Sequence, residues 1–154
     1  MAPVAGTTAG SCAGRAVSGY GNGALPAVAL CPLAYAPGEL LRADAAAAFN
    51  RLTEAARAAQ GVPLCVNDSY RSYAGQLRVY TDRPGPARPG LAAVPGTSNH
   101  GWGVAVDLCG GVESFGSAAH RWLAANAGRY GWIHPAWAEP GGSLPEPWHW
   151  EYTG

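Results

Sequence analysis

Residues 98–109 read S-N-H-G-W-G-V-A-V-D-L-C, and from residue 103 onward they alternate as a β-strand does. Val104, Val106 and Leu108 fall on one face of this strand, which we expect to pack on the core. The opposite face carries Ala105, Asp107 and Cys109. An aspartate on an otherwise apolar strand is costly to bury unless a positive group meets it. A metal ion would provide that charge.

His100 precedes this strand on a glycine-rich loop. Gly101 and Gly103 allow the backbone to fold the histidine back toward Asp107. The spacing of His and Asp is weak evidence alone, because an exposed turn histidine and a loop-capping aspartate would produce it too. We interpret the two residues as metal ligands, subject to finding a third.

The sequence E-P-W-H-W-E-Y at residues 146–152 provides the third candidate. In a terminal strand over residues 148–152, His149 and Glu151 share one face. The opposite face carries the aromatics Trp148, Trp150 and Tyr152, which we expect in the core. His149 would therefore project from a rigid strand, as a metal ligand should. Glu146 precedes it by three residues on a turn fixed by Pro147.

Two histidines and one carboxylate leave the fourth position of a zinc ion to water, whose pKa the metal lowers to roughly 7. Glu146 is the candidate to accept that water's proton. Arg71, in S-Y-R-S-Y at residues 69–73, is the candidate donor to the developing oxyanion. The alternative for Arg71 is a surface salt bridge.

Composition limits the classes of function. The chain has 154 residues, one domain's length, with 48% hydrophobic residues, 13% charged residues and zero formal net charge. No electrostatic attraction to nucleic acid or an anionic membrane surface is predicted, so we expect neither as a partner. No apolar run reaches the ~20 residues of a membrane span. The chain lacks lysine, which excludes Schiff-base and Ser–Lys mechanisms.

The four cysteines are widely spaced and form no C-x-x-C pair. An even number in a small Gly- and Pro-rich domain suits two disulfides in an oxidising compartment. Of the three connectivities we favour Cys12–Cys31 with Cys65–Cys109, because the second pair would join two predicted strands that flank one site. The alternative is four buried thiols in a cytosolic protein.

The pattern along the chain predicts a single α+β domain with a small central antiparallel sheet and helices packed on it. We expect an irregular N-terminal arm over residues 1–38 and the catalytic domain over 39–154. Helices are expected at 40–60, 73–81 and 117–126, strands at 63–67, 103–109, 132–134 and 148–152, and a loop at 82–95. His120 is expected to be solvated and His134 to end a strand, both in structural roles.

Three motifs together resemble the VanY-type D-alanyl-D-alanine carboxypeptidases, zinc peptidases grouped with lysostaphin-like enzymes and the hedgehog signalling domain. They are S-Y-R-S-Y-x-x-Q (69–76), S-x-H-x-x-G-x-A-x-D (98–107) and E-P-W-H (146–149), in the family's order, and the resemblance covers residues about 40–154. It implies zinc ligands His100, Asp107 and His149, catalytic base Glu146, carbonyl-stabilising Arg71, and contacts of Ser98 and Gln76 with the substrate's C-terminal end. Glu151 departs from many relatives, which carry a basic residue there, and this leaves exopeptidase or endopeptidase specificity open.

The resemblance implies a zinc-dependent D,D-carboxypeptidase that acts on peptidoglycan stem peptides with one zinc per chain. A lysin-type endopeptidase and an L,D-carboxypeptidase are the alternatives within the class. A non-catalytic zinc-stabilised binding module is the alternative from another class, and such a module has no need of Glu146. We expect a secreted, cell-wall-associated monomer. Met1 to Gly10 lack the features of a signal peptide, so that segment would not be in this chain.

Overall fold

The computed structural model describes residues 19–82 and 92–154 of the chain. Its helices and strands are β1 (Leu30–Leu33), β2 (Ala36–Arg42), α1 (Ala43–Gln60), β3 (Cys65–Asp68), α2 (Tyr73–Thr81), β4 (Ala105–Cys109), α3 (Ala118–Asn126), β5 (Trp132–Ile133) and β6 (His149–Tyr152). Short 3-10 helices lie at Ala27–Ala29, Asn99–Trp102, Ala127–Tyr130 and Ala136–Ala138. The expected α+β class is confirmed.

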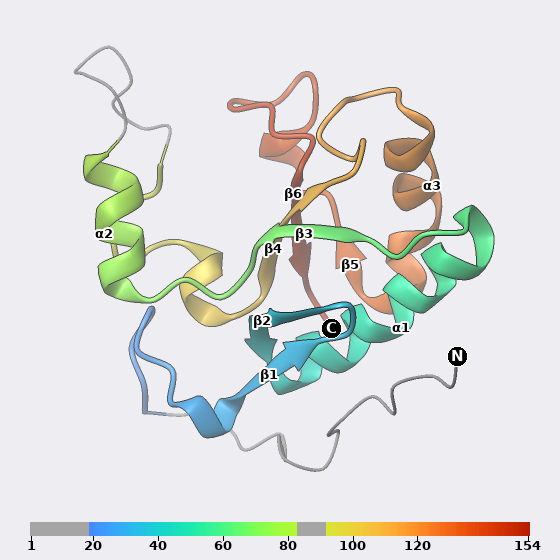
Figure 1. Ribbon diagram of the computed structural model, residues 1–154. Coiled ribbons are helices and arrows are strands. Elements are labelled where there is room, and N and C mark those ends of the chain that lie inside the picture. Colours follow the sequence, from blue (N-terminus) through green and yellow to red (C-terminus); the bar gives the residue numbers. More distant parts are fainter. Residues whose placement is uncertain (1–18, 83–91) are drawn as a thin grey trace.

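The central sheet has four antiparallel strands in the order β3-β4-β6-β5, and β1 and β2 form a separate hairpin (Figure 1). Strand β4 lies between β3 and β6. Its register places Asp107 opposite His149 on β6 and opposite Asp68 at the end of β3. Backbone hydrogen bonding thus brings residues far apart in sequence to one place on the sheet.

Helix α1 supports the sheet and the hairpin. Its sequence, ADAAAAFNRLTEAARAAQ, is rich in alanine, the residue with the highest helix propensity. Ala45, Phe49, Leu52 and Ala56 recur at helical spacing and are all buried in the main core. The helix ends at Gly61, whose positive φ of 83° suits the left-handed C-terminal cap.

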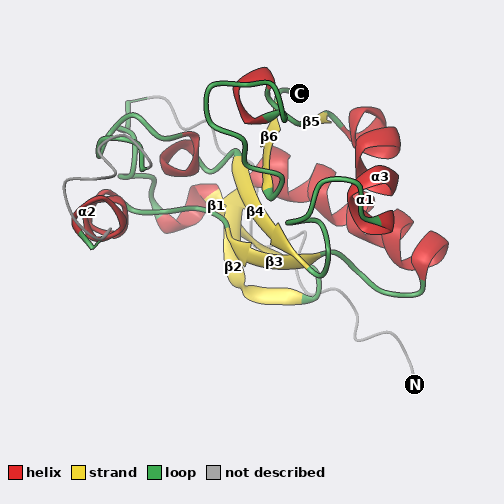
Figure 2. Ribbon diagram, turned by 90° about the horizontal axis from the view of Figure 1, so that it is seen from above, coloured by secondary structure: helices red, strands yellow, loops and turns green. Residues whose placement is uncertain are grey.

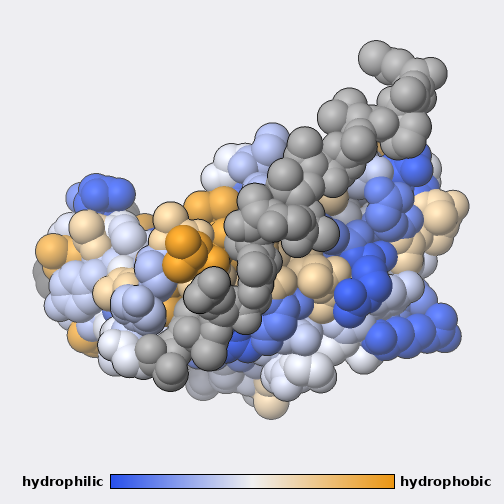
Figure 3. All heavy atoms as spheres, turned by 90° about the horizontal axis from the view of Figure 1, so that it is seen from below, coloured by the Kyte–Doolittle hydropathy of each residue, from blue (hydrophilic) through white to orange (hydrophobic). Residues whose placement is uncertain are grey.

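Helices α2 and α3 lie at opposite ends of the molecule, with the sheet between them in both views (Figures 1 and 2). Seen from below, strongly hydrophilic residues gather on the right-hand half of the surface, where Figure 1 places α1 (Figure 3). This agrees with α1 burying one face and exposing the other to solvent. Within residues 19–82 and 92–154, no helix has the length and apolar character needed to cross a membrane.

Residues 30–38 are not irregular as we expected. They form β1 and the start of β2, and the expected boundary at residue 39 falls inside β2. Leu33 and Leu41 of the hairpin are 2% and 0% exposed and belong to the main core. The predicted helix over 40–60 accordingly begins three residues later, at Ala43. The earlier part of the expected arm and most of the expected loop over 82–95 lie outside the described residues.

The predicted disulfide between Cys65 and Cys109 is present, with 4.9 Å between the two Cα atoms. The two residues face each other across β3 and β4. The other predicted pair includes Cys12, which lies outside the described residues, so the pairing of Cys12 with Cys31 stays a prediction.

The predicted faces of β4 are confirmed, because Val106 and Leu108 are buried in the core. On β6, Trp150 is also in the core, but Trp148 lines a cleft and was wrongly expected there. His120 is not solvated. It is 8% exposed, and its ring lies 5.1 Å from Phe115 and 5.7 Å from Trp150, centroid to centroid.

Candidate metal centre

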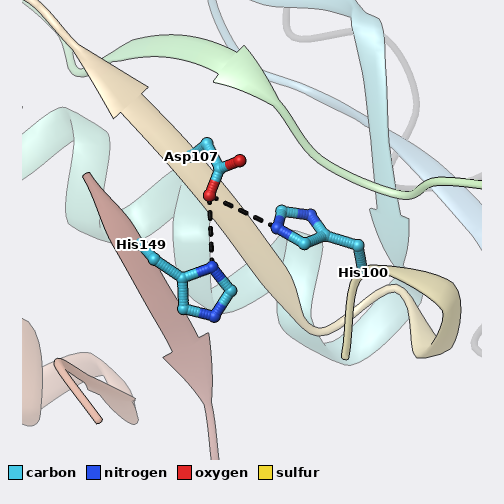
Figure 4. A group of neighbouring side chains, drawn as sticks. All are labelled: His100, Asp107 and His149. Carbon is cyan, nitrogen blue, oxygen red and sulfur yellow. Dashed lines mark hydrogen bonds and ion pairs between the residues drawn. The ribbon is translucent and has the colours of Figure 1, made fainter. Parts of the chain in front are cut away.

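Three side chains converge on one point beside β4: His100 from the 3-10 helix at Asn99–Trp102, Asp107 from β4 and His149 from β6 (Figure 4). Asp107 Oδ1 lies 3.3 Å from His100 Nε2 and 3.2 Å from His149 Nδ1. The two histidines are 3% and 6% exposed. The predicted ligands are therefore brought together in a largely buried cluster.

The loop that carries His100 depends on its glycines, as the sequence predicted. Gly103 has a φ of 67°, in the left-handed region that L side chains rarely adopt. A Cβ on Gly101 would lie 1.9 Å from Asn22 Oδ1, so a larger residue would displace the loop. Ser98 caps the short helix, since its Oγ accepts the His100 N–H at 3.2 Å.

The donor set fits a zinc ion. Four ligands at about 2.0–2.1 Å from a tetrahedral ion lie about 3.3–3.4 Å from one another. The two nitrogen–oxygen separations in the cluster match this edge length, and ligand atoms of all three residues lie within 4.8 Å of one another. Two imidazoles and one carboxylate are also the ligand types of catalytic zinc sites, which keep a fourth position open.

Hydrogen bonds outside the cluster set the ring orientations. His100 Nδ1 donates to the Ser69 carbonyl at 2.7 Å, which leaves Nε2 facing Asp107. His149 Nε2 donates to Glu151 Oε1 at 2.9 Å, which leaves Nδ1 facing Asp107. Ser69 is itself held by Glu39 through a hydrogen bond of 2.5 Å from its hydroxyl. Sequence reasoning did not identify Ser69 or Glu39 as residues of the site.

The ionisable residues of the cluster shift one another's pKa values. Burial raises the pKa of the Asp107 carboxyl, but hydrogen bonds from His100 and His149 outweigh burial and hold that pKa well below its ordinary value. Burial lowers the pKa of the His149 imidazole, but hydrogen bonds to Asp107 and Glu151 outweigh it and raise the pKa to about 9. His149 thus lies between two carboxylates that favour its protonated form, and binding of a metal ion at Nδ1 would release a proton.

Glu146 lies beside the cluster, as predicted. Its Oε2 is 3.9 Å from His149 Nδ1, and its side chain is 14% exposed. Three hydrogen bonds to the backbone of Glu146 fix the turn: its N–H donates to the Ala138 carbonyl at 2.9 Å, and its carbonyl accepts from the backbone N–H of His149 at 3.1 Å and from the side-chain Nε2 of His134 at 2.8 Å. His134 thus has the structural role that we expected, and it acts on the turn of the candidate base.

Arg71 is not a surface residue. Its guanidinium donates through Nε to Asp68 Oδ2 at 2.9 Å and through Nη1 to Gln76 Oε1 at 2.6 Å, and Nη2 also contacts Asp68. Nη2 lies 3.7 Å from Asp107 Oδ2, at the edge of the cluster. The side chain is 14% exposed, so it faces the cleft while its partners hold it in place.

The two predicted substrate contacts also line the cleft, but their polar groups already have partners. Gln76 is 3% exposed, accepts from Arg71 and donates through Nε2 to the Ala93 carbonyl at 2.7 Å. Ser98 is 8% exposed and caps the short helix. Their contact with a substrate stays a prediction, and the geometry favours a second role for Gln76 in holding Arg71.

All these residues meet in one cleft of about 300 Å³. One wall comes from α2 and the segment after residue 92, and the other from residues 137–148. The second wall is largely apolar, because Trp137, Leu144 and Trp148 form it. Sequence reasoning missed this wall, since no periodic pattern marks residues 137–144. The full lining is Arg71, Gln76, Val79, Ala92, Ala93, Thr97, Ser98, Asn99, His100, Asp107, Trp137, Leu144, Glu146, Trp148, His149 and Glu151.

The fold and the site define a class of protein: a small α+β domain in which two histidines and an aspartate that could hold a metal ion line a cleft. The sequence profile of the VanY family, D-alanyl-D-alanine carboxypeptidase, matches residues 38–154. The chain belongs to this family. A D-alanyl-D-alanine carboxypeptidase of Enterococcus faecalis (strain ATCC 700802 / V583) is 46% identical over 66 residues, which make up 40% of this chain and 25% of that protein. The match therefore spans a quarter of the relative's length.

Solved structures show the same similarity. VanYB in complex with D-Alanine-D-Alanine is 32% identical with a TM-score of 0.64, over 81% of this chain and 77% of that chain. A mutant of the vancomycin resistance D,D-pentapeptidase VanY in complex with Zn(II) is 31% identical with a TM-score of 0.64, over 81% and 78%. The LD-carboxypeptidase LdcB is 32% identical with a TM-score of 0.61, over 75% and 60%. The family resemblance drawn from the three motifs is confirmed.

Proposed function

We propose that this chain is a zinc-dependent D,D-carboxypeptidase that hydrolyses the terminal D-Ala–D-Ala bond of peptidoglycan stem peptides. One zinc per chain is held by His100, Asp107 and His149. The observation that carries the proposal is the position of Glu146, whose Oε2 lies 3.9 Å from His149 Nδ1 without being one of the three ligands. A purely structural zinc site has no need of such a carboxylate, which argues against a non-catalytic binding module.

The residues divide the chemistry among them. Zinc held by His100, Asp107 and His149 would supply a Lewis acid and would lower the pKa of a bound water to roughly 7. Glu146 accepts the proton of the attacking water at its carboxylate and delivers it to the amine that leaves when the C–N bond breaks. Arg71 donates from its guanidinium to the substrate carbonyl oxygen as that oxygen gains negative charge.

The environment of Arg71 supports its role. Asp68 and Gln76 hold the guanidinium at the cleft, so it needs little reorganisation when charge develops on the substrate. Its Nη2 group lies 3.7 Å from a carboxylate oxygen of Asp107, within reach of a carbonyl beside the metal.

The substrate class is supported by the family and by the size of the cleft. A volume of about 300 Å³ suits the small end of a peptide. The similar protein VanYB is known in complex with D-Alanine-D-Alanine. The disulfide between Cys65 and Cys109 supports an oxidising compartment, and we extend the proposal to a secreted, wall-associated monomer.

Mass analysis of synthetic stem peptides tests the proposal. The zinc-loaded protein is incubated with a pentapeptide that ends in D-Ala–D-Ala and, separately, with the tetrapeptide that ends in one D-Ala. We expect the pentapeptide to lose one alanine and the tetrapeptide to stay intact. Trimming of the tetrapeptide would assign L,D-carboxypeptidase activity, and cleavage within the stem would assign endopeptidase activity. The Glu146→Gln variant is the control for a contaminating peptidase.

A further inference from the structure

Glu151 has no role in the chemistry above, yet its carboxylate lies against a metal ligand. Its Oε1 is 2.9 Å from His149 Nε2, and its side chain is 14% exposed. We propose that Glu151 is a positioning residue, whose carboxylate holds the Nε2 proton of His149 and so keeps Nδ1 directed at the metal. The proposal rests on the zinc site proposed above, and it would stand whether or not the substrate is a stem peptide.

Strand β6 fixes this contact. His149 and Glu151 are two residues apart on one strand, so their side chains leave the same face. Antiparallel pairing places His149 opposite Asp107 and Glu151 opposite Ala105 on β4. Glu151 therefore faces a methyl group across the strands, and its carboxylate is directed along β6 to the imidazole.

The hydrogen bond between Glu151 and His149 favours one of the two neutral tautomers of the imidazole. A neutral imidazole carries one proton, and the nitrogen without the proton is the one that can bind a metal. Glu151 stabilises the form with the proton on Nε2. The other form would direct an N–H group at the metal and would leave Nε2 facing a carboxylate. Trp137 packs against the ring with centroids 4.9 Å apart and the two planes inclined by 48°, a contact that does not distinguish the two nitrogens.

The two histidines differ in the group that holds the nitrogen facing away from the cluster. His100 takes its orientation from the backbone carbonyl of Ser69, which a substitution cannot remove. His149 takes its orientation from a side chain, so this half of the site can be altered by a single substitution. Partners of this kind around metal-bound histidines typically change metal affinity or activity by about 10–100-fold when they are lost.

Glu151 could instead act on the substrate, because it lines the cleft and is negatively charged. Its carboxylate is already engaged by His149 and by the side chain of Asn99. A carboxylate with two donors on it is poorly placed to receive a further group, which favours the role toward His149.

Metal affinity, measured by zinc competition with a chelator in the absence of substrate, separates the two roles. Glu151→Leu removes the acceptor, and we expect zinc to bind about 100-fold more weakly. Glu151→Gln keeps one acceptor oxygen for two donors, and we expect a loss of about 10-fold. Glu54→Gln is the matched control, because Glu54 is exposed on α1, and we expect no change in zinc affinity.

A second measurement is the visible spectrum of the cobalt-substituted protein, which reports the ligand geometry. We expect the spectrum of Glu151→Leu to differ from that of the wild type and the spectrum of Glu54→Gln to match it. Zinc affinity and cobalt spectra equal to the wild type in both Glu151 variants, with a change only in KM, would overturn the proposal and assign Glu151 to the substrate. If Glu151→Leu does not fold, the zinc affinity of Glu151→Gln alone tests the proposal, and an affinity equal to that of the wild type would overturn it.

Discussion

Removal of the disulfide between Cys65 and Cys109 should lower the stability of the fold considerably. The bond joins residues separated by 44 positions, and its loop contains the arginine, the first histidine and the aspartate of the site. In the chain-entropy treatment, closing such a loop lowers the entropy of the unfolded chain by about 13 cal/mol/K, which is about 4 kcal/mol at 25 °C. Replacing both cysteines by serine should therefore lower the free energy of unfolding by about 4 kcal/mol.

Serine suits both positions, because Cys65 is exposed and Cys109 is half-buried. Replacing both residues also avoids a lone thiol that could exchange with the remaining cysteines. Urea unfolding of the metal-free wild type and of the double variant, each followed by circular dichroism, gives the two free energies by linear extrapolation. An unchanged free energy with an unchanged denaturant slope would refute the reasoning, and so would free thiols at Cys65 and Cys109 in the purified, unreduced protein.

Three further predictions concern the site. His149→Ala should retain well below one equivalent of zinc by elemental analysis, and full retention would remove His149 from the ligand set. Glu146→Gln should keep zinc and the fold but lose at least about 10²–10⁴-fold in turnover, because an amide accepts no proton at neutral pH; turnover near that of the wild type would exclude Glu146 as the base. Arg71→Ala should lower kcat by roughly 10²–10³-fold through loss of the oxyanion donor, and an unchanged kcat with a higher KM would limit Arg71 to binding.

The central strands were predictable because their side chains alternate between core and site. Val106 and Leu108 face one side of β4 and Asp107 the other, so the sequence pattern and the packing agree. The same alternation on β6 placed His149 correctly. It misplaced Trp148, which precedes the first residue of β6 and turns toward the cleft.

The hairpin of β1 and β2 was missed because local residues argue against strands there. Pro32 lies in β1 next to an irregularity in the pairing, and Tyr35 at the turn has a positive φ of 66°. Proline is tolerated in a two-stranded edge arrangement, where not every N–H group is needed for pairing. Burial of Leu33 and Leu41 against α1 stabilises the hairpin, and such a tertiary contact leaves no local signal.

His120 was predictable in principle. His120, Leu123 and Ala127 recur at i, i+3 and i+7, and all three are buried. The adjacent Arg121 favoured the solvated interpretation, although neighbouring residues on a helix face different directions. Burial, and then the nearby His134, lowers the pKa of His120, consistent with a packing role.

The convergence of His100, Asp107 and His149 could be predicted from the motifs, but most of the contacts that orient these side chains could not. Ser69 acts through its backbone carbonyl, which any residue type could supply. Glu151 contacts His149 through its side chain, and only the position of both residues on one face of β6 indicated that contact in advance. The apolar wall of Trp137 and Leu144 comes from the short 3-10 helix at Ala136–Ala138 and the segment after it, which have no periodicity to interpret.

Release of D-alanine from a stem pentapeptide during a zinc titration of the metal-free protein tests the central claim most directly. The rate should be negligible without metal, rise in proportion to added zinc, and level off at one equivalent per chain, because His100, Asp107 and His149 form one site. Release that persists under a strong chelator, or no release at full zinc occupancy, would contradict the assignment of this chain as a zinc-dependent D,D-carboxypeptidase.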